Sequence, residues 1–160
     1  MNQLEEHHIK ALEDSDCFRG MNPEGLAHVI SACTLHEFEA GQVIVKEVAA
    51  GKELFIIVSG LVEVEIARPL ESGPGFRLGP LKPGACFGEI SLVDGCLRSA
   101  TVRARQNVEV LVIPEEKLHH LFEVDPELGF LFMKNVALIL SSRIREANIR
   151  LRNALSHLYI

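Results

Sequence analysis

An acidic and a basic residue stand nine positions apart in a mostly apolar stretch that runs from Phe87 to Val102. Glu89 and Arg98 would each cost free energy in a half-buried pocket unless each found a partner. A small anionic sugar supplies both partners, because its hydroxyl can donate to the carboxylate while its phosphate accepts a forked pair of hydrogen bonds from the guanidinium. The pair therefore predicts a binding site for such a sugar.

The neighbours of this pair would complete the site. Ser99 and Ala100 offer backbone N–H groups and one hydroxyl to the same phosphate, and a run of amides of this kind binds anions. Gly88 lets the backbone approach the sugar where a Cβ would intrude. A cyclic nucleotide carries both required groups, a ribose 2′-hydroxyl and a cyclic phosphate.

The segment strongly resembles the phosphate-binding cassette of cyclic nucleotide-binding domains, in which Phe-Gly-Glu is followed by apolar residues, a short turn and Arg-(Ser/Thr/Ala)-Ala-Thr. Upstream, Gly41 and Gly60 stand where the family's jelly roll turns its corners, and the similarity covers roughly residues 12 to 145. The chain departs from the family at Leu97, where a proline is usual, so φ is not preset there. It departs again at residues 48–50, where the family has a Gly-Asp turn.

This resemblance implies a sensor domain like those of catabolite activator-type regulators and of cyclic nucleotide-dependent kinases and channels. The purine base would lie against three apolar residues, Val64, Leu78 and Ile90. A C-terminal helix would cover the base at three positions, Ile139, Arg143 and Ile144. Arg143 would either stack on the base or point to solvent. The hydroxyl of Ser99 suits the 2-amino group of guanine and equally a phosphate, so cAMP and cGMP both stay open.

The surrounding elements follow from local signals. Helix starts are indicated at Asn22-Pro23-Glu24, Asp125-Pro126-Glu127 and, more weakly, Pro114-Glu115-Glu116. Between residues 38 and 113 the pattern is that of strands and turns. We expect a mainly β fold with flanking helices, a double-stranded β-helix or jelly-roll barrel with an N-terminal helix and a long C-terminal helix. Residues 1–126 would hold the N-terminal helices and barrel, and residues 127–160 the C-terminal helix.

That last helix should run for about 30 residues, since no proline follows Pro126 and no glycine follows Gly129. Its apolar residues recur every three or four positions, at Met133, Ala137, Leu140, Ile144, Ala147, Leu151, Ala154 and Leu158. Such a heptad seam predicts a coiled-coil homodimer. The alternative is a single amphipathic helix packed on its own barrel.

Composition narrows the class of protein. A chain of 160 residues suits one domain, and no apolar run reaches the roughly 18 residues that a membrane span needs. The first residues lack the features of a secretory signal, so we expect a cytoplasmic protein without membrane contact. Four cysteines without a Cys-x-x-Cys pair are expected to be reduced, buried thiols, and no metal site is expected.

Neither catalysis nor DNA binding is indicated. A cupin-type enzyme needs several histidines on barrel strands, whereas all seven histidines fall outside the predicted strands, so we expect no enzyme, no catalytic residue and no cofactor. The net charge of −6 argues against nucleic-acid binding, and the scattered cations of residues 127–160 are typical of a solvated helix face. Two alternatives stay open: a degenerate domain that docks an unknown protein partner, or the ligand-sensing fragment of a transcription regulator lacking its DNA-binding domain.

Overall fold

The computed structural model describes residues 4–68 and 75–158. Its elements in chain order are α1 (Glu6–Glu13), α2 (Pro23–Ala32), β1 (Thr34–Phe38), β2 (Val43–Val45), β3 (Leu54–Ser59), β4 (Val62–Ile66), β5 (Phe76–Leu81), β6 (Cys86–Phe87), α3 (Glu89–Asp94), β7 (Thr101–Ala104), β8 (Val108–Ile113), α4 (Glu115–Val124) and α5 (Pro126–Leu158). Across those described ranges, no helix combines the length and the apolar character required to cross a membrane.

The strands form two antiparallel four-stranded sheets, ordered β1-β8-β3-β6 and β2-β7-β4-β5. Apolar residues of both sheets, among them Ile57 of β3 and Val62 of β4, form one buried cluster. A β-domain with flanking helices and a long C-terminal helix is thereby confirmed, and closure of the sheets into a jelly-roll barrel stays a prediction.

The first strand begins earlier than the sequence pattern indicated. β1 pairs with β8 from Thr34 opposite Val112 to Phe38 opposite Val108, so His36 lies on a strand. The expectation that every histidine lies outside the strands was therefore wrong. β1 is an edge strand with no fully buried residue, so its sequence lacks the regular alternation of apolar and polar residues that reveals a half-buried strand.

Side-chain caps fix two of the three helix starts that the sequence predicted, whereas α4 begins after Pro114 without one. The side chain of Asn22 accepts a hydrogen bond from the Gly25 amide at 2.7 Å at the start of α2. Asp125 accepts from the Leu128 amide at 3.0 Å at the start of α5. Each carboxamide or carboxylate satisfies an N–H group that has no partner within its helix.

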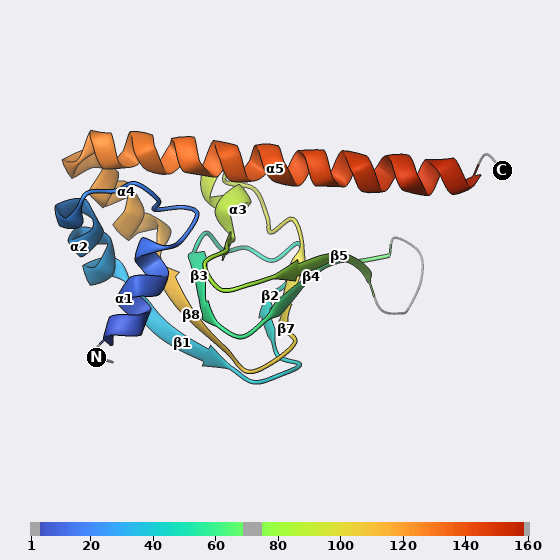
Figure 1. The fold of residues 1–160 in the computed structure, drawn as a ribbon, viewed down its shortest axis with the longest axis horizontal. Coiled ribbons are helices and arrows are strands. Elements are labelled where there is room, and N and C mark those ends of the chain that lie inside the picture. The colour runs from blue at the N-terminus through green and yellow to red at the C-terminus, as the bar shows by residue number, and fades with distance from the viewer. Residues whose placement is uncertain (1–3, 69–74, 159–160) are drawn as a thin grey trace.

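α5 is one helix of 33 residues, which confirms the predicted length. Its first half is anchored, because Leu128, Phe132 and Val136 are buried in a second apolar cluster shared with the other helices and with β3 and β8. Its second half runs on over the β4–β5 end of the molecule, as Figure 1 shows, and residues 144–156 are all exposed.

A disulfide bond joins Cys17, between α1 and α2, to Cys86 at the start of β6. The expectation of four reduced thiols was therefore wrong for this pair, which is separated by 69 positions in the sequence and meets only when the fold forms. Cys33 is a half-buried free thiol, whereas Cys96 is free and exposed, contrary to the expected burial. Burial raises the pKa of the Cys33 thiol from 9.0 to about 12, although nearby Lys117 opposes the shift.

Candidate functional site

A cavity of about 680 Å³ lies between the second half of α5, the start of α3 and the sheet that contains β4 and β5. Ten of the eleven residues expected to form the site line this one cavity: Val64, Leu78, Gly88, Glu89, Ile90, Arg98, Ser99, Ala100, Arg143 and Ile144. The fold thus brings together residues spread over 80 positions of the chain. Whether they contact a ligand stays a prediction.

Glu89 is the first residue of α3, and its side chain is only 1% exposed. The turn into this helix needs glycine at position 88, where φ is +87° and an added Cβ would lie 2.5 Å from the carbonyl oxygen of Glu53. The Glu89 carboxylate accepts a hydrogen bond from the guanidinium of Arg143 on α5. The buried acid therefore has a cationic partner supplied by the chain itself.

Arg98 is also buried, with its side chain 5% exposed, and its guanidinium donates to four acceptors. One nitrogen donates to Ser91 Oγ at 2.7 Å and to the Gly88 carbonyl at 3.1 Å. The other donates to the Glu53 carboxylate at 2.7 Å and to the Glu53 carbonyl at 3.0 Å. Sequence reasoning missed two of these partners, Glu53 and Ser91. For Glu53 the reason is that an acid 45 positions upstream leaves no local signal of this contact.

The two departures from the family pattern lie next to each other in space. The Val48 amide donates to the Arg98 carbonyl at 2.9 Å, and the Arg98 amide donates to the Ala49 carbonyl at 3.0 Å. These two hydrogen bonds fix the backbone of Arg98 although Leu97 replaces the usual proline. The loop around residues 48–50 thus substitutes for the rigidity that proline would have given.

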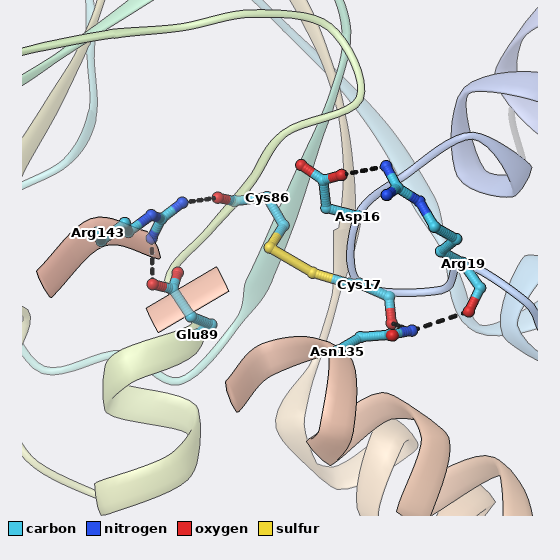
Figure 2. The surroundings of a disulfide bond; sticks show 7 residues. All are labelled: Asp16, Cys17, Arg19, Cys86, Glu89, Asn135 and Arg143. Atoms are coloured by element: carbon cyan, nitrogen blue, oxygen red, sulfur yellow. Dashed lines mark hydrogen bonds and ion pairs between the residues drawn. A yellow bond between two sulfur atoms is a disulfide. The ribbon is translucent and has the colours of Figure 1, made fainter. Parts of the chain in front are cut away.

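Arg143 is held by two hydrogen bonds and does not point freely to solvent, while its stacking on a base stays a prediction. One of its nitrogens donates to Glu89 Oε1 and the other donates to the carbonyl oxygen of Cys86 at 2.6 Å. Figure 2 shows the guanidinium between the two acceptors. Arg143 thereby connects α5 to both α3 and β6, so the helix position depends on the cassette.

The apolar part of the cavity contains Val64, Leu78 and Ile90, with four apolar residues of α5 on the other side: Leu140, Ile144, Ala147 and Leu151. Ile139 was predicted to cover this region, but it packs against the apolar cluster under the helices instead. The cavity-facing residues of α5 are 140, 143, 144, 146, 147, 150 and 151, which lie on one broad side of the helix.

Two further charged residues line the cavity near β5 and were not predicted. Arg150 lies over β5, since a Cβ on Gly79 would stand 3.2 Å from its Nη2. Glu146, one helical turn earlier, is its ion-pair partner at 3.7 Å. Both side chains are more than half exposed, so solvent screens this pair and little free energy holds it together.

One cluster of candidate metal ligands, His7, His8 and Glu109, occurs within the described ranges. His8 Nδ1 accepts a hydrogen bond from the Glu5 amide at 2.8 Å, so the neutral ring carries its proton on Nε2. Nε2 is the atom that faces Glu109, at 4.0 Å. A protonated nitrogen cannot ligate a cation, so this geometry does not suit a metal ion.

The chain is similar to known proteins in family, in sequence and in fold. The family described as "Cyclic nucleotide-binding domain" matches residues 35–125. A cyclic nucleotide-gated potassium channel of Mesorhizobium japonicum is 32% identical over 117 residues, which are 73% of this chain and 30% of the channel. The cyclic AMP receptor protein of Thermus thermophilus is 31% identical over 140 residues, which are 88% of this chain and 62% of the receptor.

The fold is also shared with solved structures. A cyclic nucleotide-binding domain from Methylobacillus flagellatus superposes with a TM-score of 0.81 at 23% identity, over 93% of this chain and 83% of that one. The chain spans less than two thirds of the length of the two curated relatives named above.

Proposed function

Because this chain belongs to the cyclic nucleotide-binding domain family, we propose that it is a sensor module, not an enzyme, that binds a purine cyclic nucleotide between α5 and the β4–β5 sheet. Glu89 accepts a hydrogen bond from the ribose 2′-hydroxyl. Arg98 donates to the cyclic phosphate together with the amides of Ser99 and Ala100. The observation that carries the proposal is that one acid and one base, both buried, line the same largely apolar cavity.

Binding exchanges one acceptor of Arg98 for another. Glu53 is about half exposed, so its carboxylate can leave the guanidinium and return to water at little cost, whereas Arg98 stays buried. A phosphate has the same charge and a similar spacing of oxygen atoms, so it can accept the same donors. Glu89 keeps its second carboxylate oxygen for the ribose, because Arg143 donates to Oε1.

The charges near β5 favour guanine over adenine. Arginine carries only donors, and guanine presents two adjacent acceptors, O6 and N7, where adenine presents one donor and one acceptor. Arg150 lines the cavity beside Gly79 and is held only by the screened pair with Glu146. Cyclic GMP is therefore the nucleotide we propose, with cAMP as the weaker ligand.

Occupancy is passed on through α5. Leu140, Arg143 and Ile144 line the cavity from this helix, so a bound base contacts it directly. The exposed apolar residues of its second half, Ile144, Leu151 and Leu155 among them, are available for a homodimer. Two of them also line the cavity, so ligand binding and dimer formation share residues.

Titration calorimetry of the nucleotide-stripped protein with cGMP, cAMP and cyclic di-GMP tests the proposal. Glu89→Ala should weaken cGMP binding ten- to a hundredfold, as expected when a hydrogen bond to a charged group worth about 1.5–3 kcal/mol is lost. The loss should shrink for 2′-deoxy-cGMP. Glu116→Ala, an exposed acid on α4, is the matched control and should bind like the wild type.

A second candidate is supported by the same ion pairs. Glu89 and Arg98 are both satisfied within the chain, so the pocket can persist without a ligand, as a docking scaffold would require. Absence of heat with all three nucleotides would favour the scaffold.

If the losses of affinity for Glu89→Ala and for the 2′-deoxy ligand simply add, Glu89 does not hold the 2′-hydroxyl.

A further inference from the structure

The disulfide joins the cavity to a distant part of the fold. Cys86 opens β6 and stands three residues before Glu89, while Cys17 lies in the turn between α1 and α2. Both residues are essentially unexposed. β6 has only two residues and lies at the edge of its sheet, paired with β3 alone. The disulfide is therefore a large part of what fixes this short strand.

α5 contacts both halves of the disulfide through their backbone carbonyls. Asn135 donates to the Cys17 carbonyl at 3.1 Å, and Arg143, two turns later, donates to the Cys86 carbonyl at 2.6 Å. Figure 2 shows the two contacts on either side of the sulfur–sulfur bond. The second of them comes from the same guanidinium that pairs with Glu89. Disulfide, α5 and the ribose-binding acid thus form one connected network.

We propose that Cys17 and Cys86 form a reversible thiol–disulfide site whose oxidised state raises the nucleotide affinity of the cavity. The inference rests on the proposed function, because the effect of oxidation is measured as a change in nucleotide affinity. The exchanging partner is a dithiol. One of its thiolates attacks a sulfur of the disulfide, which releases one cysteine as a thiolate and forms a mixed disulfide. Its second thiolate then displaces the other cysteine, so two electrons and two protons pass to the protein and the dithiol becomes a disulfide.

Oxidation favours binding because it fixes the acceptor of Arg143. With the bond intact, the Cys86 carbonyl is held in place, Arg143 is directed to Glu89, and the acid is already positioned for the ribose. After reduction β6 keeps its pairing with β3 and the stacking of Phe87 on Phe55 but loses its covalent link to Cys17, and part of the binding free energy is used to order the strand. We expect about tenfold weaker binding in the reduced protein.

Burial sets the route of exchange. A dithiol can reach the sulfur atoms only after a local opening of the segment between α1 and α2, which Asn135 and the hydrogen bond from the Asp16 amide to the Gly84 carbonyl hold closed. Of the two remaining cysteines, Cys33 keeps its proton far above neutral pH because burial raises its pKa to about 12. It is therefore a poor nucleophile and does not compete for the disulfide.

The proposal has a reciprocal consequence. If the oxidised form binds a nucleotide tenfold more tightly, a saturating nucleotide must stabilise the disulfide by the same factor. For a two-electron couple a factor of ten corresponds to about 30 mV, so the reduction potential should become more negative by about that amount. Affinity and potential are measured independently and must agree.

The test uses the wild-type protein equilibrated in buffers of defined dithiol–disulfide ratio. Alkylation and mass spectrometry count the free thiols, calorimetry with cGMP and with cAMP gives the affinity of each form, and the midpoint is measured with and without saturating nucleotide. Cys33→Ser is the matched control and should keep both the tenfold ratio and the shift. The double variant Cys17→Ser/Cys86→Ser should bind like the reduced protein in every buffer.

Any of four results would overturn the inference. Two concern affinity: the two forms bind within twofold of each other, or the reduced form binds more tightly. Two concern the bond: the disulfide never forms, or a dithiol cannot reduce it in the folded protein. A protein that binds neither nucleotide in either form refutes the proposed function as well, and that failure is recognised because the thiol count still changes with the buffer. A difference in affinity between the two forms without the matching shift in reduction potential would also contradict the redox inference, since linkage requires that the two changes agree.

Discussion

Replacing Arg143 by methionine should destabilise the protein even when no ligand is present. The Glu89 side chain is 1% exposed and loses its cationic partner, while the Cys86 carbonyl loses a donor. Removing one member of a buried ion pair costs roughly 3–5 kcal/mol. Because the Arg143 side chain is one third exposed, solvent screens part of this, and we expect a loss of about 2–3 kcal/mol in the free energy of unfolding.

Urea unfolding followed by circular dichroism measures the loss as a lower midpoint at unchanged slope. Glu89→Gln removes the charge that needs a partner, so adding Arg143→Met to it should cost about 1–2 kcal/mol less than adding it to the wild type. Arg145→Met, an exposed arginine on the same helix, is the control and should change stability by less than about 0.5 kcal/mol. An Arg143→Met protein as stable as this control, or a coupling below about 0.3 kcal/mol, would refute the ion pair as a source of stability.

The remaining predictions concern the cavity, the tail and one thiol. Arg98→Leu should lower cGMP affinity at least ten- to a hundredfold and also reduce stability, because three residues lose a buried donor; binding within threefold of wild type would contradict the site. Ile144→Asp should turn a dimer into a monomer and change nucleotide affinity, which light scattering with and without nucleotide tests; a variant that stays dimeric makes the seam an intramolecular face. Arg150→Ala should reduce cGMP affinity at least fivefold and cAMP affinity less than twofold, whereas Arg152→Ala should alter neither; equal losses for both nucleotides contradict guanine recognition. Relative to Cys33→Ser, the wild type should lose about 1.4 kcal/mol of stability per pH unit between pH 10 and 11. The reason is that the unfolded thiol is already ionised in this range, whereas the folded thiol, with a pKa of about 12, keeps its proton. Urea midpoints of the two proteins that stay parallel across that range would exclude this.

The sequence predicted structure correctly where the interactions that form it lie between residues close together in the chain. Asn22 and Asp125 cap helices within three residues of themselves, so their roles are visible in a short window. Gly88 was interpreted as making room for a sugar, which stays a prediction, whereas in the structure its positive φ and the nearby Glu53 carbonyl oxygen require glycine there. The long helix followed from the absence of proline and glycine after residue 129.

Contacts between distant segments were not predictable in the same way. Glu53 contacts Arg98 across 45 positions, and Cys17 is bonded to Cys86 across 69 positions. In both pairs, the residues near one member in the sequence do not indicate the other member. The family resemblance implied that α5 would lie over the pocket, but it did not show where along the helix the contacts with the apolar cluster end and those with the cavity begin. Ile139 packs on the apolar cluster under the helices, whereas its neighbour Leu140 contacts both that cluster and the cavity.

The division of α5 into an anchored half and an exposed half gives it the mechanics of a lever. Its fulcrum lies near Val136, the last fully buried apolar residue of the helix among those described, and the helix continues from there for 22 residues to Leu158. At a rise of 1.5 Å per residue that arm is about 33 Å long, so a tilt of about 10° moves its tip by roughly 6 Å. The Arg143 contacts lie about 10 Å from the fulcrum, where the same tilt displaces side chains by only about 2 Å. A displacement of about 2 Å at the Arg143 contacts would therefore reach the end of the helix magnified about threefold.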